Sequence, residues 1–414
     1  MTRREPIALD DSAGSDDADG PGTNPSATRL RTPAFIALFG AAFAFFTAGG
    51  TVLPVASRFA DGPLGADSIG VGIAIGAFAV AALAMRPAVG WASDRFGRRP
   101  LLVGGSLLTV VALALHLVVT SLPAFIAVRS LLGVGEAFFF VAALAAFSDL
   151  APEDRRGEAM NLGSLSVYLG LAIGPLMGET ILSPAGFDAV WIVAALMATL
   201  ATVLTLRVPE TAPTIVAHHA GPRARARLIH PAGLLPGFLI LTGAWGMAGY
   251  FAFLPLYATD VGMDGAGGAF AVYALVVVGL RIVFAKLPDQ IGAARLSGAA
   301  LAVSAVGLTI LALVGGPIGL LAGTVVFAVG VAFMFPALMS VAVSRVDETE
   351  RGSVVGTTSA FLDLSFGLAP AVLGIVVGAS GFGVAFGLSA AIALGGSALL
   401  FLRRGSMTRP VRVS

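Results

Sequence analysis

The chain has 414 residues, of which 57% are hydrophobic and 12% are charged, and its mean hydropathy is +0.92. Soluble globular proteins carry about 25% charged residues, so this composition excludes an ordinary soluble domain and predicts a protein that crosses a membrane several times. Cysteine is absent, which excludes disulfides, thiol chemistry and cysteine-ligated metals. The four histidines are scattered and show no metal-ligand spacing, so we expect no metal. The net charge is +1, and we expect no nucleic-acid partner. We also expect no cofactor.

The first 32 residues are polar and acidic and contain no cleavable signal peptide. We expect 1–32 to form a disordered cytoplasmic tail, because this composition cannot bury enough apolar surface to fold. Apolar runs follow, each long enough to cross the roughly 30 Å hydrocarbon layer as a helix. They lie near 34–56, 68–90, 100–120, 123–148, 159–183, 187–206, 234–258, 267–288, 295–314, 317–344, 352–378 and 382–403. The sequence therefore predicts about twelve transmembrane helices and an all-α membrane protein.

The runs form two sets of six. We expect an N-terminal bundle at 33–206, a cytoplasmic linker at 207–233, a C-terminal bundle at 234–404 and a cytoplasmic tail at 405–414. Pro370 minus Pro175 gives an offset of 195, and the same offset carries Arg86 onto Arg281 and the motif Gly-x-Ala-Phe-x-Phe at 135–140 onto 330–335. Matching residues at one offset predict two pseudo-symmetric six-helix bundles of the same topology.

Arginine is concentrated in the loops that lie on the same side as both tails. That side holds Arg95, Arg98, Arg99, Arg155, Arg156, Arg207, Arg223, Arg225, Arg227, Arg295, Arg345, Arg351, Arg403 and Arg404, whereas the other side keeps essentially Arg58. The positive-inside rule therefore puts both termini in the cytoplasm. A basic set dominated by arginine is typical of a GC-rich prokaryote, so we expect a multi-pass protein of the inner (cytoplasmic) cell membrane.

A short charged loop separates the second and third runs. Its pattern G-x-x-x-D-R-x-G-R-R is made by Gly90, Asp94, Arg95, Gly97, Arg98 and Arg99. This pattern resembles the loop between spans 2 and 3 of the major facilitator superfamily (MFS), and the resemblance extends over almost all of 33–404. It implies the MFS fold, and it implies that the Asp94 loop ties the two halves together on the cytoplasmic side and favours an outward-open state. The alternative is that the arginines only enforce topology.

Two charged residues lie in the fourth run. Arg129-x-x-x-Gly133-x-Gly135 resembles the span-4 signature of the superfamily, which implies that Arg129 faces the central cavity and assists proton transfer. Glu136 follows seven residues later on nearly the same helix face. Charges inside the bilayer are costly unless they meet water, a partner or a substrate, so both are candidates for proton coupling or substrate binding. A structural charge pair between helices is the alternative.

The fifth run carries a motif made of Gly170, Gly174, Pro175 and Gly178. It resembles the G-x-x-x-G-P-x-x-G-G signature of the antiporter branch, which implies export in exchange for protons. The chain departs from this signature at Glu179, which replaces the last glycine, and at Asn161, which replaces an upstream one. Asn161, Tyr168 and Glu179 lie within about 20° of one another on a helix, so this stripe is a further candidate for the cavity wall. Packing against a neighbouring helix is the simpler role of the glycines.

Asp363 lies about eleven residues into the eleventh run, roughly 16 Å deep, with no basic neighbour on its own helix. A lone carboxylate at that depth is expected to be protonated much of the time and to release its proton when a cation binds or water enters. Pairing with Arg281, or a hydrogen bond to a hydroxyl, is the alternative. Arg86 and Arg281 lie nearer the cytoplasmic ends of their spans, where snorkelling explains them.

These features predict a secondary active transporter, similar to the drug:proton antiporter branch, that exports a small amphipathic molecule by alternating access. We expect no enzyme activity and no catalytic residue, since nothing resembles a phosphate loop, nucleophile elbow or zinc helix. The expected partners are a small-molecule substrate, protons and membrane lipid, and one chain is expected to function as a monomer. A proton symporter or uniporter that imports a sugar or organic acid is the first alternative. A non-transporting membrane sensor or subunit is an alternative of another class.

Overall fold

A computed structural model describes Leu30 and residues 32–152, 155–211, 229–284, 287–344, 346 and 351–403. The expected N-terminal tail, apart from Leu30 and Thr32, most of the linker and the C-terminal tail lie outside the described residues. Within helices, the side chains of Asp94, Asn161, Pro288, Asp289 and Arg351 also lie outside the described residues.

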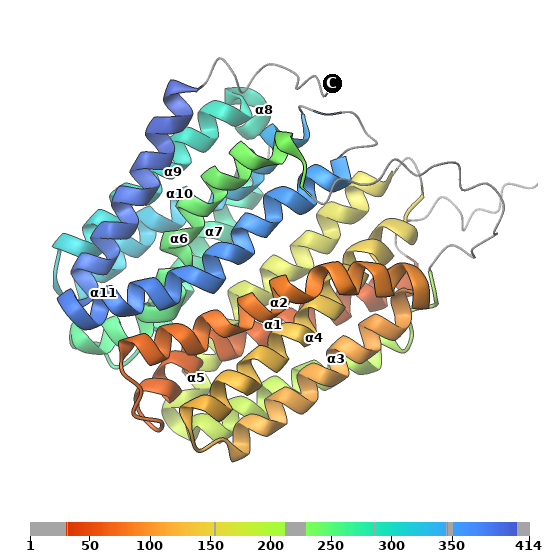
Figure 1. Ribbon diagram of the computed structural model, residues 1–414, viewed down its shortest axis with the longest axis horizontal. Helices are drawn as coiled ribbons and strands as arrows, with labels where there is room; N and C mark the ends of the chain where they lie inside the picture. The colour runs from red at the N-terminus through yellow and green to blue at the C-terminus, as the bar shows by residue number, and fades with distance from the viewer. Residues whose placement is uncertain are drawn as a thin grey trace, which may run out of the picture.

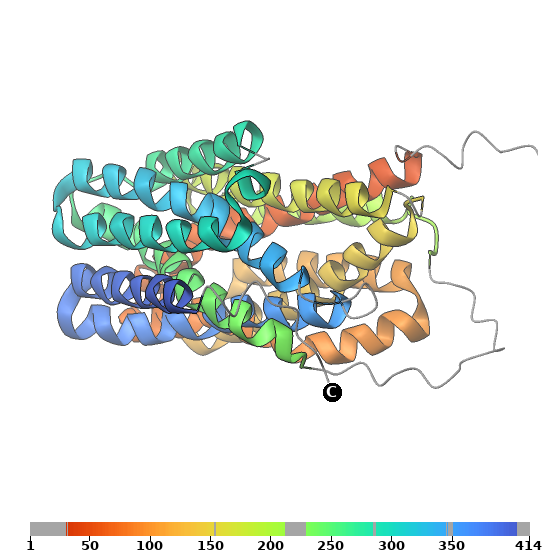
Figure 2. The same ribbon diagram turned by 90° about the horizontal axis from the view of Figure 1, so that it is seen from above.

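The regular structure of the described ranges is helical. In chain order the helices are α1 (Pro33–Asp61), α2 (Ser68–Phe96), α3 (Arg98–Leu115), the 3-10 turn η1 (His116–Val118), α4 (Leu122–Asp149), α5 (Arg156–Thr205), α6 (Pro231–Asp260), α7 (Gly267–Val283), α8 (Leu287–Ile291), α9 (Ala293–Leu313), α10 (Gly316–Val343) and α11 (Arg351–Leu402). Figure 1 shows α1–α5 gathered on one side and α6–α11 on the other, and Figure 2 shows the long helices running along a common direction. We call these sets the N-terminal half and the C-terminal half.

Two of the helices are each divided by a glycine. Gly186 has φ 76° inside α5, and Gly381 has φ 82° inside α11. Glycine adopts this left-handed backbone without steric cost, so the chain can turn back at both positions. The two glycines are separated by 381 minus 186, or 195 residues, which is the offset of the sequence repeat. The structure therefore repeats the same helix–turn–helix at the same place in each half.

The number of membrane-crossing segments agrees with the expected twelve. Nine of the described helices are long and apolar enough to cross a membrane, and two of these nine are the divided helices α5 and α11. Seven undivided helices, four parts of the divided ones and the shorter apolar helix α7 give twelve segments. Leu275, Leu313 and Ile318 are 75%, 78% and 83% exposed. Large apolar side chains on the outside suit contact with lipid.

Helix boundaries follow local sequence signals. The hydroxyl of Thr32 accepts from the Phe35 amide at 3.2 Å at the start of α1, and Asp67 accepts from the Gly70 amide at 2.7 Å at the start of α2. The predicted run 267–288 is shorter in the structure, because α7 ends at Val283 and the short helix α8 begins at Leu287. The Leu287–Pro288 pair explains this, since a proline fits the first turn of a helix but not its interior.

The buried core differs between the two ends of the molecule. We call the end where α1 finishes and α2 begins the Arg58 end, and the end where α2 finishes and α3 begins the Arg98 end. At the Arg58 end one buried cluster contains residues of both halves, for example Val52 and Ile75 with Phe253 and Leu373. At the Arg98 end the described residues form separate clusters, one in the N-terminal half and two in the C-terminal half. The two halves are therefore joined at the Arg58 end.

Candidate functional site

The two halves meet most closely between α2 and α11. A Cβ atom on Gly72 would contact the backbone of Pro370 and Ala371, and a Cβ atom on Gly76 would meet the carbonyl oxygen of Gly367. Only glycine allows backbones to approach so closely. Both contacts lie in the half of α2 nearest the Arg58 end. They close this end of the interface.

An ion pair joins the halves directly below this closed segment. Nη2 of Arg86 in α2 donates to Oδ1 of Asp363 in α11 at 2.9 Å, and the two side chains are 22% and 16% exposed. Asp363 lies one helical turn before Gly367, so the pair follows the last close backbone contact. The sequence-based alternative of pairing with Arg281 is wrong, because the partner is the arginine of the other half. Snorkelling is likewise not needed to explain Arg86.

Glu136 of α4 lies within electrostatic range of this ion pair. It interacts electrostatically with both Arg86 and Asp363, and it is half-buried. The Arg86 guanidinium also lies over the ring of Phe140, 5.4 Å from its centre and one turn after Glu136. Oδ2 of Asp363 and Nε of Arg86 are buried with no hydrogen-bond partner among the described residues. Asp363 is therefore paired directly with Arg86, and Glu136 lies within electrostatic range of both. Asp363 and Arg86 have hydrogen-bonding capacity left for a proton, water or ligand.

A second contact between the halves is the symmetry mate of the first. The offset of 195 carries Arg86 onto Arg281 and Tyr168 onto Asp363. Cζ of Arg281 in α7 lies 3.8 Å from the centre of the Tyr168 ring in α5, so this contact also joins opposite halves. Tyr168 was expected in the cavity wall, and the structure brings it to this interface. Because Arg86 and Arg281 are repeat mates, as are Tyr168 and Asp363, the sequence repeat could have indicated that both arginines belong to the interface between the halves.

Glu179 makes a third contact between the halves, at the Arg58 end. Its Oε2 accepts from Nη1 of Arg58 at 3.1 Å and from the Ala266 amide at 3.3 Å. The Glu179 side chain is 3% exposed and that of Arg58 is 25% exposed. Ala266 is the N-cap of α7 and offers no capping side chain of its own. The carboxylate thus caps a helix of the other half, where its charge also suits the positive end of the helix dipole.

We predict that Glu179→Ala weakens the closure of the Arg58 end, because both charge-assisted hydrogen bonds are lost. At about 1–3 kcal/mol for such contacts, the closed population should fall by about 5-fold to 150-fold relative to the open one. Leu53 of α1 packs against the C-terminal half, and the chain contains no cysteine. A single Leu53→Cys substitution therefore reports the opening as faster labelling by a maleimide on the purified protein.

The matched control for this prediction is Glu158→Ala. Glu158 forms an ion pair with Arg155 at 2.7 Å within one half, and both side chains are well exposed. Its removal should leave the labelling rate of the Leu53→Cys protein unchanged. Equal labelling rates for Glu179→Ala and the parent would contradict the assigned role of Glu179.

Arg129 lies inside the N-terminal half. It is 3% exposed, its Nε donates to the Ala74 carbonyl of α2 at 3.4 Å, and its guanidinium lies over the ring of Phe78 at 5.3 Å. Among the described residues Arg129 forms no ion pair, so the alternative of a charge pair with Glu136 is not what its contacts show. Its expected part in proton transfer remains a prediction.

The charged loop between α2 and α3 is bound by its own half. Nε of Arg98 lies 3.3 Å from Oδ2 of Asp149 at the end of α4. The Arg98 amide donates to Glu210 at 2.7 Å, and Nη2 of Arg99 donates to the Leu206 carbonyl at 2.9 Å. These contacts fix the loop to α4 and to the segment after α5. A latch between the halves, as the resemblance implies, stays a prediction for a state closed at the Arg98 end.

Other members of the predicted sets have simpler surroundings. The Arg95 guanidinium lies over the rings of Trp91 and Phe96, at 5.4 and 5.7 Å. Gly97 has φ 96°, a conformation that favours glycine. The side chains of Asp94 and Asn161 lie outside the described residues, so their expected roles stay predictions.

The glycines of the fifth run pack against α1. A Cβ atom on Gly170 would lie 2.7 Å from the Thr47 amide nitrogen, one on Gly174 would lie 2.7 Å from the Gly50 Cα, and one on Gly178 would contact the Thr51 carbonyl. Pro175 packs in the same groove, since its Cδ would lie 3.1 Å from a Cβ on Gly50. The motif therefore builds a tight α1–α5 contact within the N-terminal half, as its packing role predicts.

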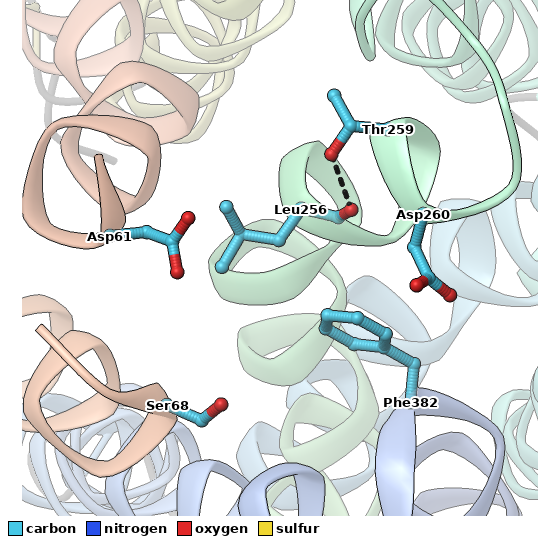
Figure 3. Close-up of a pocket in the computed structure, with 6 residues that line it drawn as sticks. All are labelled: Asp61, Ser68, Leu256, Thr259, Asp260 and Phe382. Carbon is cyan, nitrogen blue, oxygen red and sulfur yellow. Dashed lines mark hydrogen bonds between the residues drawn. The ribbon is translucent and has the colours of Figure 1, made fainter. Parts of the chain in front are cut away.

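A shallow cavity of about 340 Å³ opens at the Arg58 end between the halves. It is lined by Asp61, Ser68, Leu256, Thr259, Asp260 and Phe382. Figure 3 shows Asp61 and Asp260 reaching this space from opposite halves, with the Thr259 hydroxyl bound to the Leu256 carbonyl. The cavity lies on the outer side of the close α2–α11 contacts. It is a vestibule separated from the Arg86–Asp363–Glu136 cluster.

Comparison with known proteins gives a consistent result. The family model described as Major Facilitator Superfamily matches residues 34–356 and 266–412. An MFS-type transporter of Salmonella typhimurium is 29% identical over 342 residues, which cover 80% of this chain and 86% of the relative. An MFS-type transporter of Burkholderia mallei is 29% identical over 362 residues, which cover 84% and 87%.

Solved structures share the fold at low sequence identity. A bacterial homologue of the human lysosomal transporter Spinster, in an inward-facing and unoccupied conformation, has a TM-score of 0.75 at 15% identity and covers 93% of this chain and 98% of its own. The nucleoside transporter NupG has a TM-score of 0.70 at 16% identity, with coverage of 91% and 100%. A peptide transporter in complex with alafosfalin has a TM-score of 0.73 at 16% identity, with coverage of 92% and 97%.

Proposed function

Because the chain belongs to the major facilitator superfamily, whose members are secondary transporters that work by alternating access, we propose that it couples proton entry to the export of a small amphipathic molecule. The proposed proton site is the cluster of Arg86, Asp363 and Glu136. In this proposal the Arg98 end faces the cytoplasm of the cell and the Arg58 end faces outward, as the arginine distribution predicts. The site is then closed to the outside in the conformation described above.

The observation that carries the proposal is the ion pair between Arg86 and Asp363 of opposite halves, with the carboxylate of Glu136 within electrostatic range of both. Arg86 and Glu136 belong to the N-terminal half and Asp363 belongs to the C-terminal half, with 2.9 Å between Arg86 Nη2 and Asp363 Oδ1. Protonation of Asp363 removes the charge that attracts Arg86 and so weakens a contact between the halves. Since binding free energies are reciprocal, a movement that separates Arg86 from Asp363 in turn changes the proton affinity of the carboxylate. A single group thus connects proton binding to the relative position of the halves.

The proton gradient supplies enough free energy for this work. A membrane potential of 100 mV gives about 2.3 kcal/mol per charge, and one unit of pH adds about 1.4 kcal/mol. One proton therefore supplies about 3.7 kcal/mol, which sustains a substrate gradient of roughly 500-fold. One carboxylate that takes and releases a proton in each cycle is sufficient for export.

The proposal is tested with purified protein in liposomes that contain a pH-sensitive dye. Cationic, neutral and anionic compounds are first screened for thermal stabilisation of the protein, and those that bind are added to the liposomes. If the protein is an antiporter, the dye must report protons that move in the direction opposite to the substrate. Substrate uptake that follows imposed proton entry would instead establish the symport alternative, and transport without any proton movement would establish a uniporter.

A further inference from the structure

Arg281 and Arg86 are repeat mates with different surroundings. Arg86 meets the carboxylate of Asp363, whereas Arg281 meets the ring of Tyr168, the residue equivalent to Asp363 in the other half. Nε of Arg281 donates to the Ala332 carbonyl at 3.1 Å. The repeat therefore supplies one arginine with a counter-charge and the other with a neutral phenol.

This difference leaves a positive charge at the interface. Among the described residues no carboxylate forms an ion pair with Arg281, and its electrostatic neighbour Tyr273, which also interacts with Tyr168, is a second phenol. A guanidinium stays charged in proteins. A charge inside a membrane protein is costly unless it meets a counter-ion or water. The C-terminal half thus offers a cation whose partner is not supplied by the described residues.

The contacts of Arg281 with described residues do not use its two terminal nitrogens. One face of the guanidinium is covered by the Tyr168 ring, and Nε is bound to Ala332. The two terminal nitrogens have no hydrogen-bond partner in the described ranges, and the side chain is half-buried. Their parallel N–H groups match the two oxygens of a carboxylate, which can accept from both at once. Stacking on Tyr168 holds this donor pair in a fixed plane.

We propose that Arg281 binds the carboxylate of the substrate, so that the transported compound is an amphipathic organic anion. The proposal rests on the proposed transport function, because the interface between the halves is taken as the substrate path. It assigns separate roles to the two arginines. Arg86 acts with Glu136 and Asp363 on protons, and Arg281 recognises the charge of the substrate.

The test uses 2-naphthoate and 2-naphthamide, which share a ring system and differ in charge. Binding of each to the purified full-length protein is measured by calorimetry without any gradient. The wild type should bind the naphthoate at least about tenfold more tightly than the amide. Arg281→Gln should lower the naphthoate affinity by about 10-fold to 100-fold and leave the amide affinity unchanged, because only the charged pair is lost. The control is Arg295→Gln, which removes an exposed arginine of the same half and should leave both affinities unchanged.

A wild type that does not prefer the anion would overturn the proposal, as would an Arg281→Gln protein that keeps the preference. Should Arg281→Gln fail to fold, Arg281→Lys decides, because lysine keeps the charge but cannot bind both oxygens in a plane. Its ratio of affinities should fall by about tenfold, and an unchanged ratio overturns the assignment. Failure of the transport function gives a different pattern, namely naphthoate binding at Arg281 without substrate-driven proton movement in liposomes.

Discussion

Replacing Asp363 by asparagine is expected to lower substrate-driven proton movement by about 100-fold, to the level of protein-free liposomes. Asparagine fills the same space but cannot carry a proton, so the halves lose the group that connects proton binding to their movement. Exchange of labelled substrate across the membrane, which needs no proton, should continue. Glu136→Gln should reduce proton movement as well, because the Glu136 carboxylate acts electrostatically on both Arg86 and Asp363. The dye assay in liposomes measures both effects.

The control for this prediction separates loss of a proton site from loss of structure. Asp363→Asn leaves Arg86 without its ion-pair partner, and an unpaired charge in the interior can itself destabilise a protein. The double variant Arg86→Gln with Asp363→Asn removes both charges and should melt nearer to the wild type than Asp363→Asn alone, yet it should show no coupling. Glu158→Gln removes an exposed carboxylate of the N-terminal half and should couple normally. Unchanged coupling in both Asp363→Asn and Glu136→Gln would refute the assigned proton site.

The fold could be predicted from the sequence because it depends on strong local signals. The apolar runs predicted the number of segments. Gly186 lies directly before the predicted run 187–206, and Gly381 lies directly before the predicted run 382–403. The single offset of 195 required two halves of one topology. The error at 267–288 arose because hydropathy does not detect a helix end inside an apolar stretch, whereas the proline at 288 is a local signal for the first turn of a new helix.

The candidate site could be predicted only in part, because it is assembled from both halves. The depth of Asp363 in its span identified an unusual carboxylate, but no spacing along one helix shows that α2 supplies its partner. Helical periodicity put Arg129 and Glu136 on one face, yet Arg129 points to α2 and Glu136 interacts with the interface. A rotation of seven residues still leaves about 20° between the two, and side chains as long as these reach different neighbours across that angle. Which residue a charged side chain pairs with depends on how the helices pack against one another.

Glycine substitutions should distinguish the interface that moves from the packing that does not. A Cβ atom on Gly76 of α2 would meet the Gly367 carbonyl of α11 in the other half, whereas one on Gly174 of α5 would meet Gly50 of α1 in the same half. Overpacking of this kind costs about 1–3 kcal/mol. In Gly76→Ala the cost falls only on the state closed at the Arg58 end, because alternating access separates α2 from α11 there in the other state. We therefore expect about 5-fold to 150-fold less of the closed state and little change in Tm.

In Gly174→Ala the same cost falls on every conformation, because the contact of α1 with α5 lies within one half. We expect Tm to fall by about 3–10 °C with no change in the labelling of Leu53→Cys. Gly49→Ala is the matched control, since a Cβ atom there would have nothing within 4 Å, and alanine should slightly stabilise α1. If Gly76→Ala instead lowered Tm like Gly174→Ala and left labelling unchanged, the α2–α11 contact would be part of the permanent core. Alternating access would then have to separate the halves at an interface other than the one that the Arg86–Asp363 ion pair spans.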